Sequence, residues 1–428
     1  MIDQAQPLPY QVEGVRHLVS VLNNKPAALE ASGTGYGKTY VSLFAAEHLK
    51  LRPAIVCTKP GIFGWQEACE LIGIEPLFIT NYEQVKLKKF QHGGWKRKNQ
   101  VYEWNLPDNT LLIFDECHKM KNPSTQNSKV GIAGTAVDKI LLLSATCASS
   151  PMDMFAMGII LGLFDTKLQF RAWKERYGVK EGQWGEFFDN TEPWHMVNLH
   201  KVLFPDLGHR VRVSDIPDFP KNHITTIQVK GKETPRVAKY LKALDEIRLS
   251  DEPLPIVDLL RARQEAEVLK VYQMIEDAEE LLNEGYSVVF FVCFSETFTM
   301  IQEAMGKLGV TSSLIHGKQT GTQRIEEMKS FQDNTNHACI CQIRAGGESI
   351  NLHDLHGRPR ASLMSPSYSA EELIQALGRI CRANSKSPAI QRMYFCAGTV
   401  EEKVRRAVQN KVKNIDLLND GDVNPFER

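Results

Sequence analysis

The sequence has no excess of either charge, no paired cysteine motif and no long apolar run. Lys and Arg total 51 and Asp and Glu total 51, so any binding to a polyanion must come from a local basic patch. The nine cysteines include no Cys-x-x-Cys pair, which favours free thiols in a reducing compartment over a zinc site. The apolar run near 157–164 is too short to span a bilayer, and the first residues form no secretion signal. These absences predict a soluble, unsecreted protein of the cytoplasm, nucleoid or nucleus, without a membrane partner.

What the sequence does contain is a glycine-rich turn over 32–39, Ser-Gly-Thr-Gly-Tyr-Gly-Lys-Thr, between a short apolar strand candidate and a helical pattern. In such a turn successive backbone N–H groups face an anion, Lys38 reaches the terminal phosphates and the Thr39 hydroxyl ligates Mg²⁺. The general pattern begins with Gly where this chain has Ser32, and a flexible loop is the alternative for the turn taken alone. The predicted nucleotide-binding residues of the turn are Gly33, Thr34, Gly35, Gly37, Lys38 and Thr39.

An acidic pair follows the apolar strand candidate 111–114. Since ligands of open α/β sheets bind at the carboxyl edge, Asp115 is predicted to hold Mg²⁺ and Glu116 to orient or deprotonate the attacking water in ATP hydrolysis. Ser144 and Thr146 follow another strand candidate, and we expect their hydroxyls to hydrogen-bond to the acidic motif, which includes His118, and to couple to its state.

Gln11 stands near the start of an amphipathic helix pattern. A glutamine side chain carries both a donor and an acceptor and so can bind an adenine edge at two places. A plain surface glutamine is the alternative.

The most basic run, 86–98, interleaves lysines with aromatic residues. That mixture suits a nucleic-acid backbone, and a solvated loop is the equally weighted alternative. The predicted contacts in this run are Lys86, Lys88, Lys89, Lys96 and Arg97.

Strand and helix patterns alternate along the 428 residues, which predicts an α/β protein with parallel sheets and two or three domains. We place the first domain at 1–215, with a helical protrusion over about 151–210 whose aromatic residues are core. Prolines between 217 and 255 mark an inter-domain passage at 216–255, and a second α/β domain follows at 256–428.

The second domain has no phosphate turn of its own. Within Gln-Ala-Leu-Gly-Arg-Ile-Cys-Arg at 375–382, Arg379 and Arg382 are three apart, so we expect them to share a helix face and reach one phosphate group together. This asymmetry predicts that the second domain completes the nucleotide site of the first.

The motifs stand in the order found in superfamily 2 helicases and translocases, which the chain resembles: the phosphate turn, Asp-Glu-Cys-His, Ser-Ala-Thr and Gln-x-x-Gly-Arg-x-x-Arg. Within that superfamily it looks most like the Swi/Snf-like ATPases, particularly the compact annealing-helicase branch. This closer resemblance rests on further segments, including Leu-Pro-Tyr-Gln at 8–11, Lys-Met-Lys-Asn-Pro at 119–123 and Ala-Gly-Gly-Glu-Ser-Ile-Asn at 345–351. Two features depart from that branch, namely Ser-Ala-Thr instead of Gly-Thr-Pro-like residues, and Cys117 instead of Ala.

The resemblance implies two tandem RecA-like domains with parallel sheets and a helical insertion on the first, with ATP and Mg²⁺ in the cleft between the domains. It assigns adenine recognition to Gln11, catalysis to Lys38 and Glu116, and the arginine-finger role to Arg379 and Arg382. The residues that it places on the nucleic-acid track are Lys59, Thr80, Gly346 and Asn351, and Gln375 joins the coupling set.

The implied function is a nucleic-acid-stimulated ATPase that acts as a monomer on DNA, as a translocase or helicase of the fork-remodelling, branch-migration or strand-annealing type, in repair or replication. An RNA helicase and a non-catalytic nucleic-acid-binding scaffold are the alternatives.

Overall fold

The computed structural model describes residues 5–96, 100–183, 185–212, 216–229, 256–343, 350–367, 369–397, 399 and 401–420. The chain divides into two compact units, one of Met1–Pro217 with Lys411–Arg428 and one of Asp218–Asn410. Each unit contains one six-stranded sheet in which all paired strands are parallel. The predicted fold class, two tandem RecA-like α/β domains, is confirmed.

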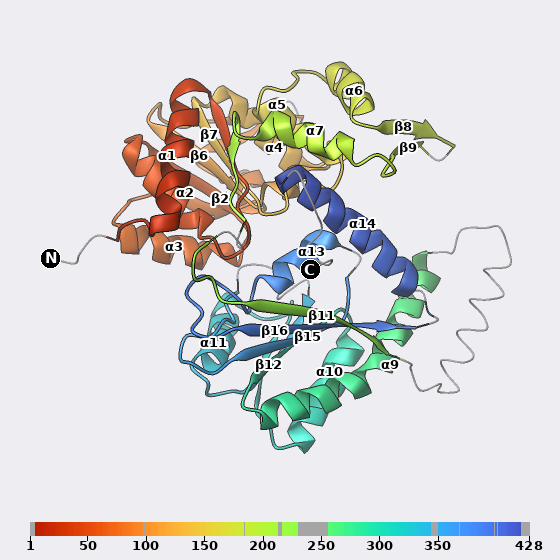
Figure 1. Ribbon diagram of the computed structural model, residues 1–428. Helices are drawn as coiled ribbons and strands as arrows, with labels where there is room; N and C mark the ends of the chain where they lie inside the picture. The colour runs from red at the N-terminus through yellow and green to blue at the C-terminus, as the bar shows by residue number, and fades with distance from the viewer. Residues whose placement is uncertain are drawn as a thin grey trace. The chain divides into compact units, whose positions relative to one another are not determined.

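The sheet of the first unit has the strand order β10-β1-β7-β6-β2-β3. Its strands are β1 Ala27–Glu30, β2 Arg52–Cys57, β3 Phe78–Asn81, β6 Thr110–Asp115, β7 Lys139–Leu143 and β10 Gly208–His209. Most of their residues are buried, as expected of parallel strands covered on both faces. The helices nearest the sheet are α1 Pro9–Asn24, α2 Lys38–His48, α3 Gly61–Ile72, α4 Gln126–Ala133 and α5 Phe155–Ile160. α1 packs on α2 and α2 packs on α3 (Figure 1).

The region predicted as a helical protrusion contains two helices and a hairpin. These are α6 Lys167–Arg176, α7 Trp194–Leu203 and the antiparallel pair β8 Val179–Gly182 and β9 Gly185–Phe188. Both α6 and the hairpin extend from the margin of the first unit (Figure 1). Phe155, Phe164 and Phe170 form an apolar cluster, so this part of the aromatic set is core, as predicted. Phe187 and Trp194 are exposed, so for them the prediction of a core position is wrong. The end of the region differs from the prediction, because β10 pairs with β1 in the main sheet.

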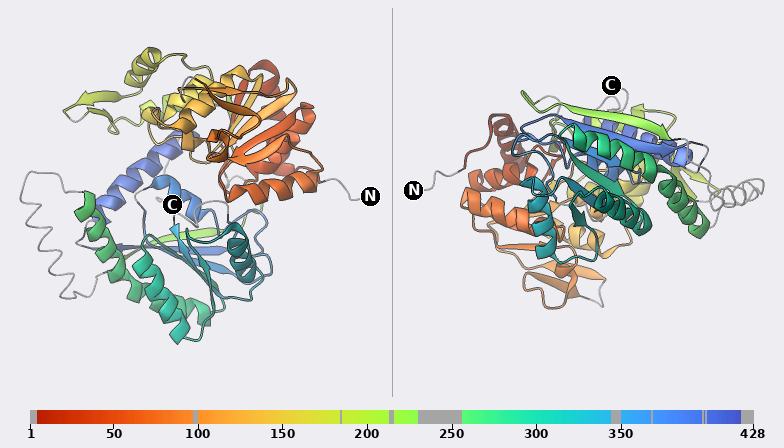
Figure 2. Two further views of the ribbon diagram at one scale, coloured as in Figure 1. Left: turned by 180° about the vertical axis from the view of Figure 1, so that it is seen from behind. Right: turned by 90° about the horizontal axis from the view of Figure 1, so that it is seen from below.

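The sheet of the second unit has the strand order β11-β16-β15-β12-β14-β13. Its strands are β11 Asn222–Val229, β12 Ser287–Val292, β13 Ser312–Ile315, β14 Ala338–Gln342, β15 Arg360–Met364 and β16 Ala389–Cys396. The helices are α9 Ile256–Asn283, α10 Ser295–Lys307, α11 Gly321–Gln332, α13 Ala370–Leu377 and α14 Glu401–Asp420. α9 contacts β12 and β16, and α10 contacts β14 (Figure 2).

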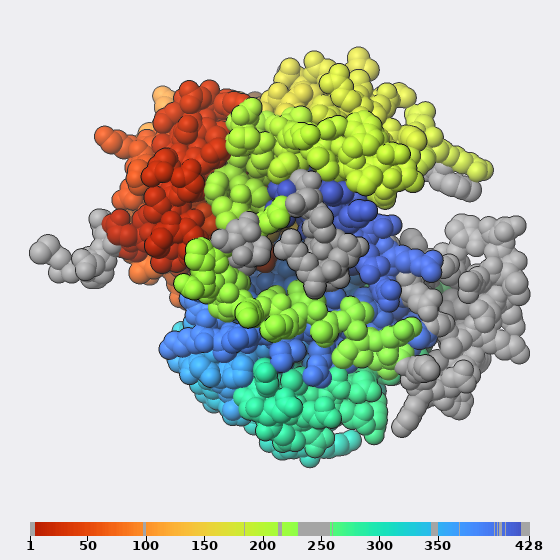
Figure 3. Space-filling view, viewed as in Figure 1, coloured from red at the N-terminus to blue at the C-terminus, as the bar shows by residue number. Residues whose placement is uncertain are grey.

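Two predicted boundaries differ from the structure. β11 lies inside the predicted passage 216–255, pairs with β16 along its length and runs over the surface of the second unit as an edge strand (Figure 3). The residues of α14 from Lys411 onward belong to the first unit, although the second domain was predicted to extend to 428. Among the described helices, none is long and apolar enough to cross a membrane.

Candidate nucleotide-binding site

The phosphate turn joins β1 to α2, which begins at Lys38. Gly35 and Gly37 have left-handed backbones, with φ of 88° and 89°, and a Cβ on Gly37 would lie 2.4 Å from Nε2 of Gln11. Both positions therefore require glycine. The Lys38 ammonium donates to the carbonyl oxygens of Ser32 at 2.9 Å and Gly33 at 3.2 Å.

The charge of Lys38 is balanced by neighbouring acids. Burial lowers the pKa of Lys38, and the carboxylates of Glu116, Glu30 and Asp115 act in the opposite direction. A glycine-rich turn at a helix start, with a lysine beside acidic residues, fits a nucleoside triphosphate with a divalent cation.

Gln11 is buried, which excludes the surface-residue alternative. Its Oε1 accepts from the backbone N–H of Leu8 at 3.0 Å, and its Nε2 donates to the carbonyl oxygen of Tyr36 at 3.0 Å. The side chain therefore fixes the start of α1 to the phosphate turn.

The acidic pair lies where β6 ends, at the same sheet edge as the phosphate turn. Trp65 donates its indole N–H to one carboxylate oxygen of Asp115 at 2.9 Å, and the backbone N–H of Glu116 donates to the other at 2.9 Å. Burial, with the charge of Glu116 added, raises the pKa of Asp115 to about 6. Glu116 itself has a left-handed backbone with φ of 52°, which is unusual for a residue with a side chain.

A chain of polar contacts runs from Glu116 to the Ser-Ala-Thr segment. Nδ1 of His118 lies 3.3 Å from Oε2 of Glu116 and 3.1 Å from the hydroxyl of Ser144. That hydroxyl also accepts from the backbone N–H of Thr146 at 3.1 Å. The Thr146 hydroxyl itself is buried and has no hydrogen-bond partner among the described residues, so only the contact predicted for Ser144 is present. Through Ser144, the acidic motif is connected to the end of β7.

The segment 209–211, for which the sequence predicted no role at the site, supports the phosphate turn from the far side. The backbone N–H groups of Ala31 and Gly33 donate to the carbonyl oxygens of His209 and Val211, at 2.9 and 3.2 Å. The Ser32 hydroxyl accepts from the N–H of Val211 at 3.0 Å. Ser32 replaces the usual glycine, and this contact gives its side chain a structural role.

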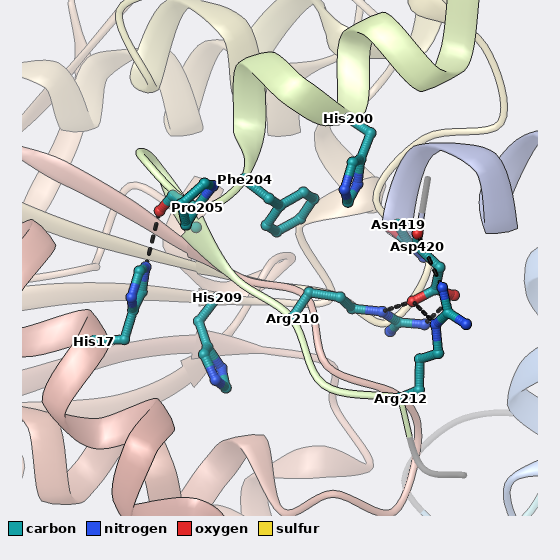
Figure 4. Close-up of a pocket in the computed structure, with 10 residues that line it drawn as sticks. His17, His200, Phe204, Pro205, His209, Arg210, Arg212, Asn419 and Asp420 are labelled. Atoms are coloured by element: carbon teal, nitrogen blue, oxygen red, sulfur yellow. Dashed lines mark hydrogen bonds and ion pairs between the residues drawn. The ribbon is translucent and has the colours of Figure 1, made fainter. Parts of the chain in front are cut away.

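Glu30 and His209 extend that support. The carboxylate of Glu30 accepts from the N–H of Ser32 at 2.9 Å and lies 2.8 Å from Nδ1 of His209, and both side chains are buried. Beside them is a pocket of about 340 Å³ in the first unit, lined in part by His17, His209 and Arg210 (Figure 4).

The predicted nucleic-acid residues of the first unit differ in exposure. Lys59, Lys88 and Lys89 are exposed. Thr80 is buried and donates its hydroxyl to Oε1 of Gln84 at 3.1 Å. The local contacts of Thr80 favour a structural role over direct nucleic-acid contact.

Much of the basic run is folded rather than a solvated loop. It includes β4 Gly93–Lys96, which pairs antiparallel with β5 Val101–Trp104 beyond the run, and Lys96 lies 3.7 Å from Glu103 of β5. Lys86 pairs with Glu83 at 2.8 Å and donates to Oδ1 of Asn127 at 3.0 Å. The rings of Phe90 and His92 pack on Phe78, so these aromatic side chains are used within the unit. Arg97 and Gly346 lie outside the described residues.

The two arginines of the second unit are not on a helix, contrary to the prediction. α13 ends at Leu377, before Gly378, and both arginines lie in the turn that follows. Their guanidinium groups still converge, because Arg379 and Arg382 both donate to the carbonyl oxygen of Ile350, at 3.4 and 3.2 Å.

The other residues singled out in the second unit have local contacts or buried positions of their own. Gln375 is buried on α13, and the backbone N–H of Asn351 donates to the sulfur of Met328 at 3.3 Å. Cys339 and Cys341 are buried free thiols with sulfurs 3.5 Å apart. Within the described part of the chain, no group of three or more His, Cys, Asp or Glu residues is arranged to hold a metal ion.

The first unit has the parallel sheet, glycine turn and strand-end acidic pair of a P-loop nucleoside triphosphatase. Two family models match the chain, "Helicase conserved C-terminal domain" over residues 257–384 and "P-loop containing NTP hydrolase pore-1" over residues 73–182. A protein of Acanthamoeba polyphaga mimivirus that bears the name of an ATP-dependent RNA helicase, L364, is 31% identical over 458 residues, covering 98% of this chain and 84% of the relative. The chain belongs to the superfamily 2 helicases, as a Swi/Snf-like ATPase.

Two further similarities are more distant. Chromodomain-helicase-DNA-binding protein 1-like of Mus musculus is 22% identical, over 96% of this chain and 50% of its own length, so the chain spans about half of that relative. The Sulfolobus solfataricus SWI2/SNF2 ATPase core in complex with dsDNA aligns with a TM-score of 0.42 at 17% identity, over 98% of this chain and 94% of that one.

Proposed function

We propose that this helicase-like ATPase is stimulated by DNA and acts on it as a translocase or helicase, of the fork-remodelling, branch-migration or annealing type. The observation that carries the proposal is the placement of Lys38, Asp115 and Glu116 at one sheet edge, with Glu116 joined through His118 to Ser144. A complete hydrolytic set of this kind argues against a scaffold that only keeps the fold.

The proposed roles follow from the chemistry of each group. ATP with Mg²⁺ supplies the phosphoanhydride bond and a cation that offsets phosphate charge. Lys38 and the N–H groups of the turn hold the phosphates, and Thr39 and Asp115 supply oxygen ligands for the cation. Glu116 takes the proton of the attacking water, and His118 holds the carboxylate in the required orientation.

The second unit contributes charge in this proposal. Arg379 and Arg382 act as arginine fingers, which are typically worth about 10³ to 10⁵ in the rate of phosphoryl transfer. The exposed lysines Lys59, Lys88 and Lys89, with Asn351, are the proposed contacts to the nucleic-acid backbone, and Gln11 is the proposed contact to adenine.

The deciding experiment measures phosphate release with duplex DNA, single-stranded DNA, forked DNA and RNA. DNA stimulation over a low basal rate is expected. Stronger stimulation by RNA would favour an RNA helicase, a reading supported by the name of the mimivirus relative. High hydrolysis without nucleic acid would contradict a translocase, and none under any condition would favour the scaffold.

Three variants test the residue roles. Lys38→Ala removes turnover because the phosphates lose their contact with the lysine ammonium group. Glu116→Gln also removes turnover but keeps ATP binding, since only the proton acceptor is lost. Arg382→Ala lowers stimulated turnover by about 10³ or more; a loss of only a few-fold would refute the arginine-finger role.

A further inference from the structure

The last turn of α14 bonds two loops of the proposed nucleotide site. Asn419 is buried and donates its side-chain amide to the carbonyl oxygen of Ala145 at 2.9 Å. Asp420 accepts from Nε and a terminal nitrogen of Arg210, at 2.9 and 3.1 Å. The same guanidinium donates to the carbonyl oxygen of Ala31.

Each contact leads to a different part of the site. Ala145 is the middle residue of the Ser-Ala-Thr segment, so the bond from Asn419 lies next to the hydroxyl of Ser144, which contacts His118. Ala31 directly precedes the phosphate turn. The chain neighbours of Arg210, His209 and Val211, are the residues that bond to Ala31 and Ser32.

The last turn of α14 is itself fixed by further hydrogen bonds, so it can support the two loops of the site. Arg212 also donates to the backbone carbonyl of Asp420, at 3.0 Å, and Nδ1 of His200 lies 2.8 Å from the carbonyl oxygen of Leu418. Figure 4 shows Arg210 and Arg212 converging on Asp420, with His200 on the neighbouring helix above them. Three successive residues of α14 are thus fixed within the first unit.

We infer that Asn419 and Asp420 are positioning residues for ATP hydrolysis, Asn419 through the Ser-Ala-Thr segment and Asp420 through Arg210 and the phosphate turn. The inference rests on the proposed ATPase function. It predicts different kinetic effects at the two positions. The contacts of Asn419 lead to the residues that orient Glu116, so its loss should affect kcat. The contacts of Asp420 lead to the residues that hold the phosphates, so its loss should affect the KM for ATP.

α14 offers a matched control one helical turn or so earlier. Asn414 also donates its amide to a backbone carbonyl of the first unit, that of Ser149 at 3.1 Å, and to Oδ1 of Asn190 at 2.7 Å, away from both motifs. Asn419→Ala should lower kcat by about threefold to tenfold, the worth of one hydrogen bond, with the KM for ATP nearly unchanged. Asn414→Ala should leave kcat within about twofold.

Asp420→Asn should instead raise the KM for ATP by about threefold to tenfold, because a bidentate charged pair with Arg210 is weakened. Equal effects of Asn414→Ala and Asn419→Ala on kcat would mean that the end of α14 packs on the first unit without positioning the catalytic residues, and would overturn the inference. So would an additive effect of Asn419→Ala on kcat in a Ser144→Ala background, since residues on one path must couple.

A second readout separates this inference from the proposed function. The backbone N–H of Thr146 donates to the Ser144 hydroxyl, so hydrogen exchange of peptides covering 140–150 should rise in Asn419→Ala and not in Asn414→Ala. That exchange is measurable even if the wild type hydrolyses no ATP, in which case the proposed function fails and the positioning contact is still judged. Unchanged exchange in Asn419→Ala would refute the contact itself.

Discussion

Replacing Gly37 by Ala tests whether the phosphate turn depends on a left-handed residue packed against Gln11. The backbone of Gly37 has φ of 89°, and the new Cβ would meet Nε2 of Gln11 at 2.4 Å. Relief of that contact requires Gln11 to move, which breaks its bonds to Tyr36 and Leu8. Left-handed strain costs about 1–2 kcal/mol and each lost hydrogen bond about 0.5–1.5 kcal/mol, which gives about 2–5 kcal/mol in total.

The assay can be confined to the first unit. All six tryptophans lie between residues 65 and 194, so tryptophan fluorescence during urea unfolding reports on that unit alone. Gly64→Ala is the matched control, since Gly64 is exposed within α3 and a Cβ there meets nothing within 4 Å. The same chemical change should stabilise that helix by about 0.5–1 kcal/mol.

The two glycine variants should therefore move the unfolding midpoint in opposite directions, and Gly37→Ala should also weaken ATP binding. A Gly37→Ala protein that unfolds at the wild-type midpoint and binds ATP normally would refute the reasoning. It would show that the turn adjusts its backbone without cost and that the contact of Gln11 has no energetic weight.

Three further outcomes are expected. Lys270→Met should cost about 3–5 kcal/mol by calorimetry, because it strands the buried carboxylate of Glu401, which pairs with Lys270 at 2.5 Å; adding Glu401→Gln should recover much of the loss. Burial, with Asp420 nearby, raises the pKa of Asp416 to about 8, so the folded protein keeps a proton that the unfolded chain releases and stability falls as pH rises from about 4 to about 8. Asp416→Asn should remove this fall, gaining on wild type by up to about 1.4 kcal/mol per pH unit in urea unfolding, and a pH-independent difference would contradict it. Lys88→Gln with Lys89→Gln should lower the slope of log binding constant against log salt by about 1.8 on duplex DNA, and an unchanged slope would remove these lysines from the interface.

Local patterns account for what the sequence predicted well. The apolar runs of the buried strands and the glycine turn are short-range signals, so the α/β class and the phosphate turn are readable without tertiary information. β11 was missed because an edge strand exposes much of its length, and the segment 222–229 alternates too few apolar residues to predict a strand. Arg379 and Arg382 were placed on a helix by their spacing, whereas α13 stops before Gly378 and the turn brings both side chains to Ile350.

Ser32 shows why a motif alone could not describe the site. The turn's left-handed positions, Gly35 and Gly37, admit no side chain without strain, whereas Ser32 is not left-handed and so tolerates one. Its hydroxyl is used by Val211, whose neighbour Arg210 is in turn held by Asp420. Because these partners are distant in sequence, only the folded sheet reveals that replacing glycine at position 32 adds a contact to the nucleotide site instead of removing a function.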